Sequence, residues 1–191
     1  STAQTAADNA KTTANQDVTD AQAQHETNLA AAKATADDTI ADQIAQMQDD
    51  LAAIQADVAS LTEIAAKNPD DTLIAALLDD AKAQETLAQN KLADAQKQAD
   101  AVADAPTMAA VTDLTDAVTQ DAAATADALT QADRDVSDGQ TKSDANLDAA
   151  KTAADVALAD NIAQIKQNIS DIQDDIATLT DLQDKNPGNT V

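Results

Sequence analysis

Apolar residues recur along the first third of the chain at alternating steps of four and three. This spacing is the a/d pattern of a helix that packs against other helices. No Gly or Pro interrupts residues 1–67, so the pattern predicts one helix over about residues 3–66, ending at Lys67 before Asn68-Pro69. We call such a line of apolar residues along one side of a helix a seam. The first seam consists of Ile40, Ile44, Met47, Leu51, Ile54, Val58 and Leu61.

The same pattern returns later in the chain. Residues 1–73 align with residues 119–191 at a constant offset of 118, so that Lys67-Asn68-Pro69 becomes Lys185-Asn186-Pro187. Every seam position stays aliphatic between the copies, whereas predicted surface positions change. Tandem repeats usually supply length, spacing and binding surface rather than chemistry. The second seam consists of Leu158, Ile162, Ile165, Ile169, Ile172, Ile176 and Leu179.

Two further helices are predicted. Asn68 is expected to be the N-cap, and Pro69 the first position, of a helix over about residues 70–103. Residues 104–107 break it, and a third helix is expected over about residues 107–185, because its one weak point, Gly139, costs only about 1 kcal/mol relative to Ala. The seam of the middle helix, which Glu85 interrupts, is Ile74, Leu78, Ala81, Ala88, Leu92, Ala95, Ala99 and Val102.

These lengths define a fold class, because the short helix can pair with only about half of each long one. We predict an all-α fold of spectrin-like tandem three-helix bundles that share continuous long helices. Residues 35–140 would form a complete bundle. Residues 1–34 would be the last helix of a preceding repeat, and residues 141–191 the first helix of the next. The predicted junctions lack the Gly, Ser and Pro of flexible linkers, so a stiff rod is expected.

Composition narrows the possible functions. The 191 residues include no aromatic residue and no Cys, and the formal net charge is −24, from 35 acidic and 11 basic residues. This charge argues against nucleic acid and against an anionic membrane surface as partners. No run of eighteen apolar residues is present, so no membrane span is predicted. The chain begins at Ser1 rather than Met, and we expect it to be a fragment of a longer protein.

Candidate chemistry is sparse. The one histidine, His25, becomes Ser143 in the second copy, and a structural role is expected for it. No Gly-rich phosphate loop, Cys/His metal spacing or nucleophile elbow is present. We therefore predict that the chain is not an enzyme, with no catalytic, cofactor-binding or metal-binding residues and no cofactor. Adjacent acids point about 100° apart on a helix, so solvated faces are expected for Asp37-Asp38, Asp49-Asp50, Asp79-Asp80 and Asp174-Asp175.

Two segments carry a family resemblance. Residues 101–111, with Leu114, Ala117 and Val118 following, read Ala-Val-Ala-Asp-Ala-Pro-Thr-Met-Ala-Ala-Val, and residues 146–151 read Asn-Leu-Asp-Ala-Ala-Lys. Both resemble the joints and openings of three-helix repeats in cell-wall-anchored surface proteins and adhesins of Gram-positive, lactic-acid-type bacteria. The layout is similar to that of the giant extracellular-matrix-binding proteins of staphylococci. The resemblance implies an extracellular location at the bacterial cell surface, with the full-length protein anchored in the cell wall.

The predicted function is a stiff, acidic stalk that projects a distal binding domain. One alternative is a binding module whose bundle faces recognise a host or matrix protein. Another is an ice-binding helical protein, which would need a regular eleven-residue threonine spacing. Residues Thr12, Thr13, Thr19, Thr27, Thr35 and Thr39 do not follow that spacing. Self-association is also expected, through the second seam from Leu158 to Leu179, most simply antiparallel with another copy.

Overall fold

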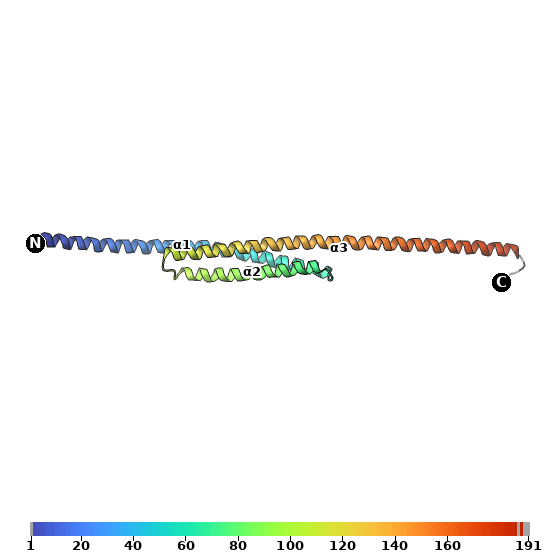
Figure 1. Cartoon of the computed structure of the whole chain (residues 1–191), viewed down its shortest axis with the longest axis horizontal. Helices are drawn as coiled ribbons and strands as arrows, with labels where there is room; N and C mark the ends of the chain where they lie inside the picture. The colour runs from blue at the N-terminus through green and yellow to red at the C-terminus, as the bar shows by residue number, and fades with distance from the viewer. Residues whose placement is uncertain (1, 187, 189–191) are drawn as a thin grey trace. The chain divides into compact units, whose positions relative to one another are not determined.

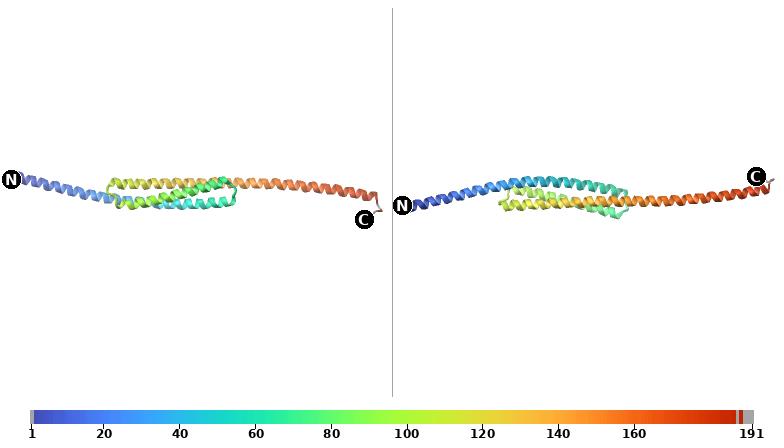
Figure 2. Two further views of the ribbon diagram at one scale, coloured as in Figure 1. Left: turned by 60° about the horizontal axis from the view of Figure 1, so that its bottom comes forward. Right: turned by 90° about the horizontal axis from the view of Figure 1, so that it is seen from above.

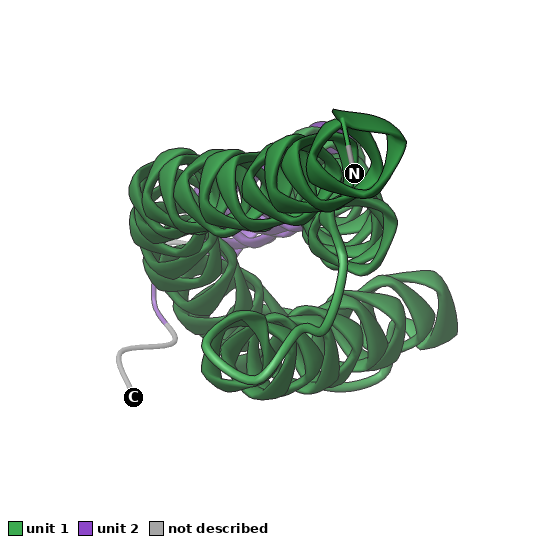
Figure 3. Ribbon diagram, turned by 90° about the vertical axis from the view of Figure 1, so that its left-hand side faces the viewer, with its two compact units in different colours: residues 1–140 green, residues 141–191 purple. Residues whose placement is uncertain are grey.

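Three α-helices make up the fold. The computed structural model describes residues 2–186 and 188, and contains α1 (Thr2–Lys67), α2 (Thr72–Val102) and α3 (Met108–Lys185), with no strand in that part of the chain (Figure 1). The all-α class and the three helices are thus confirmed, with helix ends within two residues of the predicted ones. Pro187, the end of the second Lys-Asn-Pro segment, lies outside the described residues. The chain divides into two compact units, residues 1–140 and residues 141–191, which are coloured separately in Figure 3.

Unit 1 contains a three-helix bundle. The second half of α1, all of α2 and the first part of α3 lie side by side, with α2 running in the opposite direction to the other two (Figures 1 and 2). Apolar side chains form three successive clusters along the bundle, centred on Met47, Ile54 and Leu61 of α1. Burial of these clusters holds the helices together, since the chain has no disulfide.

The innermost residues of each helix recur every seven positions. This heptad spacing is typical of coiled-coil packing. The inner residues of α1 are large, whereas three of the five inner residues of α2 are Ala, so that small residues on α2 make room for long ones on α1. The innermost residues are Ile40, Met47, Ile54 and Leu61 on α1, Ile74, Ala81, Ala88, Ala95 and Val102 on α2, and Val111, Val118, Thr125 and Ala132 on α3.

Gly139 continues this series at the next heptad position of α3. A Cβ atom added there would lie 2.8 Å from Cδ2 of Leu61. A side chain at this position would therefore require the end of the Leu61 side chain to shift.

The helix ends are fixed by side chains. Asp71, rather than the predicted Asn68, is the N-cap of α2, because its Oδ1 accepts hydrogen bonds from the backbone N–H groups of Leu73 and Ile74 at 3.0 and 3.2 Å. Asn68 instead donates from Nδ2 to the carbonyl oxygen of Ile64 at the end of α1. The prediction for Asn68 was wrong because Asn68 and Asp71 are both residue types that form N-caps, and α2 begins after Asp71.

The other joint has its own caps. Thr107 caps α3, with Oγ1 accepting from the backbone N–H of Ala110 at 3.2 Å. Lys33 of α1 donates from Nζ to the carbonyl oxygen of Ala103, 2.6 Å away, just beyond the end of α2. A cation is favourable at this position, where the last carbonyl groups of a helix carry partial negative charge.

Candidate functional site

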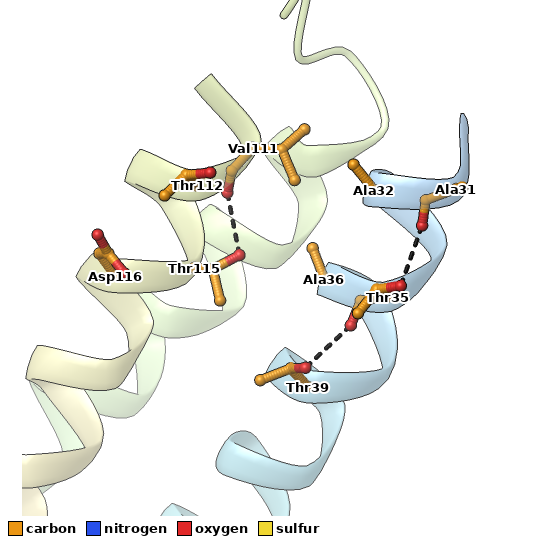
Figure 4. A pocket seen from close by; sticks show the side chains of 9 residues that line it. All are labelled: Ala31, Ala32, Thr35, Ala36, Thr39, Val111, Thr112, Thr115 and Asp116. Carbon is orange, nitrogen blue, oxygen red and sulfur yellow. Dashed lines mark hydrogen bonds between the residues drawn. The ribbon is translucent and has the colours of Figure 1, made fainter. Parts of the chain in front are cut away.

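The bundle carries an open groove between α1 and α3 with a volume of about 420 Å³ (Figure 4). Its walls are short side chains, and Asp116 is the one ionisable group among them. The lining residues are Ala31, Ala32, Thr35, Ala36, Thr39, Val111, Thr112, Thr115 and Asp116.

The threonine hydroxyls of this groove are committed to their own helices. Thr35 and Thr39 donate to the carbonyl oxygens four residues earlier, at 3.1 and 2.9 Å, and Thr112 and Thr115 do the same at 3.1 and 2.9 Å. Figure 4 shows three of these bonds. A hydroxyl nucleophile needs a neighbouring base to accept its proton. The one base in the groove walls is the Asp116 carboxylate, to which none of the described residues donates a hydrogen bond.

One ion pair links α2 to α3 inside the bundle. Lys91 Nζ lies 2.9 Å from Oδ1 of Asp121, and Gln98 Nε2 donates to Oδ2 of the same carboxylate at 3.3 Å. The hydrogen bond and the attraction to Asp121 raise the pKa of Lys91. The Asp121 carboxylate is almost completely buried, so these two donors satisfy a charge that would otherwise be costly to bury.

Two carboxyl pairs face each other across helices. Burial, followed by the nearby Asp133 carboxylate, raises the pKa of Asp57. Burial also raises the pKa of Asp135, which is 2 % exposed, and the Asp80 carboxylate adds to this, although the hydrogen bond from Gln131 opposes it. In both Asp57 and Asp135 the Oδ2 atom is buried and accepts no hydrogen bond from the described residues.

In each pair, burial and the neighbouring carboxylate together disfavour the charged form of the more buried acid. These contacts were not anticipated from the acidic doublets in the sequence. The sequence signal that could have predicted their burial is the heptad spacing. Asp121 and Asp135 lie seven residues before and seven residues after the buried Ala128, on the same side of the third helix.

The predicted candidates are dispersed in the structure. His25 is exposed on α1, beside Val18, Gln22 and Glu26. The expectation that all acidic doublets are solvated is wrong for Asp50, which is 7 % exposed and accepts from Gln46 Nε2 at 2.7 Å. Asp50 is buried because it shares the inward side of α1 with Met47 and Ile54.

Within residues 2–186 and 188, no group of three or more His, Cys, Asp or Glu side chains is placed to hold a metal ion. In the same part of the chain, no helix combines the length and the apolar character that crossing a membrane requires.

Two stretches expose faces that have buried copies in the bundle. In unit 2, the whole second seam is exposed, including Ile172 at 57 % and Leu179 at 65 %. In unit 1, residues 2–28 of α1 are exposed along their length. With the offset of 118, the exposed second seam corresponds to the buried seam of α1. Residues 2–28 correspond to residues 120–146 of α3, of which residues 120–139 lie in the bundle.

Comparison of the chain with protein-family profiles, with curated proteins and with solved structures gave no match in any of the three.

Proposed function

We propose that the chain is a structural repeat of a bacterial surface adhesin, forming part of a stiff, acidic stalk that projects a distal binding domain from the cell wall. The observation that carries the proposal is the relation between repeat and helix. The second copy of the repeated pattern, from residue 119 onward, lies in the same unbroken helix as the first part of α3, a single helix of 78 residues. A spacer requires length without hinges, and a helix continued from one repeat into the next supplies both.

The polar groups of the bundle support a spacer rather than a catalyst. Each hydroxyl of the α1–α3 groove is bonded to its own helix, and the buried charge of Asp121 is neutralised by the partly exposed Lys91. No pair of a nucleophile and a base converges on the groove. The net charge of −24 would keep neighbouring stalks soluble and apart through mutual repulsion.

Solution scattering tests the stalk. One helix of 78 residues spans about 117 Å at 1.5 Å per residue, so the maximum dimension of the particle should exceed that length. A compact particle would contradict the proposal. The location is tested with antibodies against the chain, which should label intact cells of the producing bacterium. Labelling that appears only after lysis would refute a surface location.

The alternative of a binding module has its own test. Incubation with purified host matrix proteins should leave the amide exchange of α2 and of residues 108–140 unchanged if the chain is a spacer. Specific protection of one bundle face by one host protein would favour the binding module instead.

A further inference from the structure

The second seam in unit 2 is an exposed apolar face without a partner. Its copy in α1 is buried in the bundle and shows which kind of helix face can cover it. In the bundle, the α1 seam from Ile40 to Leu61 is covered by α2 and by the first part of α3. Ile54, for example, packs in one cluster with Ala128 and Ala132 of α3. Its copy in unit 2, Ile172, has no such cover.

A copy of the covering α3 face is exposed elsewhere in the same chain. Ala128 and Ala132 correspond to Ala10 and Ala14, which lie in the exposed N-terminal stretch of α1. One molecule therefore exposes both halves of a contact that its own bundle already makes. We infer that residues 158–182 of one molecule bind residues 2–22 of a second copy, side by side and parallel, in the register of α1 against α3.

The register follows from three places where α1 and α3 meet. Gln43 bonds to Thr119 at 2.8 Å, Asp57 faces Asp133, and Leu61 lies against Gly139. The α3 residue is 76 to 78 positions later in each case. Transferred through the repeat, this register places Leu179 of one molecule opposite Ala21 of the next, and Asp175 opposite Asn15.

The sequence differences between the copies favour this two-helix contact. Two polar side chains through which α3 contacts α2 are changed in the N-terminal stretch: Asp121, the partner of Lys91, becomes Ala3, and Gln131, which donates to Asp80, becomes Thr13. The buried Asp135, beside Asp80, is kept as Asp17. A face without Asp121 and Gln131 has less need of the α2 partners that satisfy them.

The α1-facing side is kept only in part, because two residues that pack against the seam clusters in the bundle are changed, Ala122 to Gln4 and Leu129 to Lys11. Ala10 and Ala14 are unchanged relative to α3, and Asn15 replaces the carboxylate of Asp133. The Asn15 amide can donate a hydrogen bond to the Asp175 carboxylate, whereas the Asp133 carboxylate disfavours the charged form of Asp57 in the bundle. Ala21 would meet the end of the flexible Leu179 side chain, which can move aside.

The contact joins different surfaces of two molecules, so it does not close on itself and should produce end-to-end chains rather than a dimer. Both partners are strongly acidic, so salt should strengthen the association by screening their repulsion. The inference depends on the repeat and on the packing of unit 1, and would survive failure of the surface-stalk proposal.

Cross-linking of the 191-residue chain tests the contact, because these residues include no cysteine. The variants A21C and L179C, mixed in equal amounts and treated with a short bis-maleimide, should give a heterodimer joined through positions 21 and 179. The matched control mixes D20C with L179C. Position 20 corresponds to the exposed Asp138, on the side of the helix away from the bundle, and should cross-link several-fold less.

A second cysteine variant tests the main competing arrangement, in which the second seams of two molecules pair with each other. In an antiparallel pairing of two second seams, Ile169 lies near the centre and would meet Ile169 of the other copy. Efficient homodimers of I169C without the 21–179 product would overturn the end-to-end contact. So would sedimentation as a monomer at high protein and salt concentration with no cross-linking in any mixture. Species larger than dimers in the sedimentation profile, growing with salt, are the supporting result.

Discussion

Truncation of Ile54 tests the packing of the bundle with an internal control. The side chain is 0 % exposed and lies among Ala88, Ala128 and Ala132. Their methyl groups are too short to reach into the space that an I54A substitution would leave, and only the partly buried Leu51 and Leu129, which pack against this cluster, could fill part of it. Removing a buried aliphatic side chain costs about 2–5 kcal/mol, with the higher values where the site cannot collapse. We expect a loss of about 3–5 kcal/mol from the free energy of unfolding of unit 1.

Ile172 is the copy of Ile54, and the I172A variant is the matched control. The chemical change is identical, but this side chain is 57 % exposed, so the expected change is within about 0.5 kcal/mol. Hydrogen exchange of α2, measured at increasing urea and at low protein concentration, reports unit 1 alone because α2 lies entirely within it. Equal losses in the two variants, or no loss in I54A, would refute the packing described for the seam.

Three further substitutions have defined outcomes. D71A removes the α2 N-cap and should lower the stability of unit 1 by about 1 kcal/mol in urea denaturation. G139V places a branched side chain against Leu61 and should cost about 1–3 kcal/mol by thermal denaturation, whereas A21V at the exposed copy position should change the midpoint little. The raised pKa of Asp135 means that the folded state holds its proton more tightly than the unfolded chain. Stability should therefore rise as pH falls from 7 towards the unfolded pKa, and D135N should raise stability at pH 7 and flatten this slope; a steeper slope in D135N would contradict the burial of this charge.

The helices were predictable because they depend on local signals. The spacing of Ile40, Met47, Ile54 and Leu61 identifies a buried helical face without reference to any partner. The breaks at Pro69 and Pro106 mark both joints, since proline is poorly tolerated inside a helix. The three helices and their approximate ends follow from these features.

The polar interior was not predictable from the same signals. Burial of Asp50, Asp121 and Asp135 depends on how each helix is rotated in the bundle, which only the packing of all three helices determines. The use of Asp71 rather than Asn68 as the cap is likewise not decided by residue type, because both Asn and Asp are favourable N-cap residues. Residue type alone could not separate these buried acids from the many exposed ones.

The central claim is that one repeat continues into the next through an unbroken helix, and spin-label distances across residue 140 test it most directly. Nitroxides at positions 127 and 152 are separated by 25 residues of α3, or about 38 Å along a helix. The control pair, at positions 113 and 138, has the same spacing entirely within unit 1. All four positions are exposed, and the chain offers no cysteine to compete for the label. We expect both pairs to give the same narrow distribution near 38 Å. A broad or shorter distribution for the 127–152 pair alone would place a hinge between the units and contradict the stiff spacer.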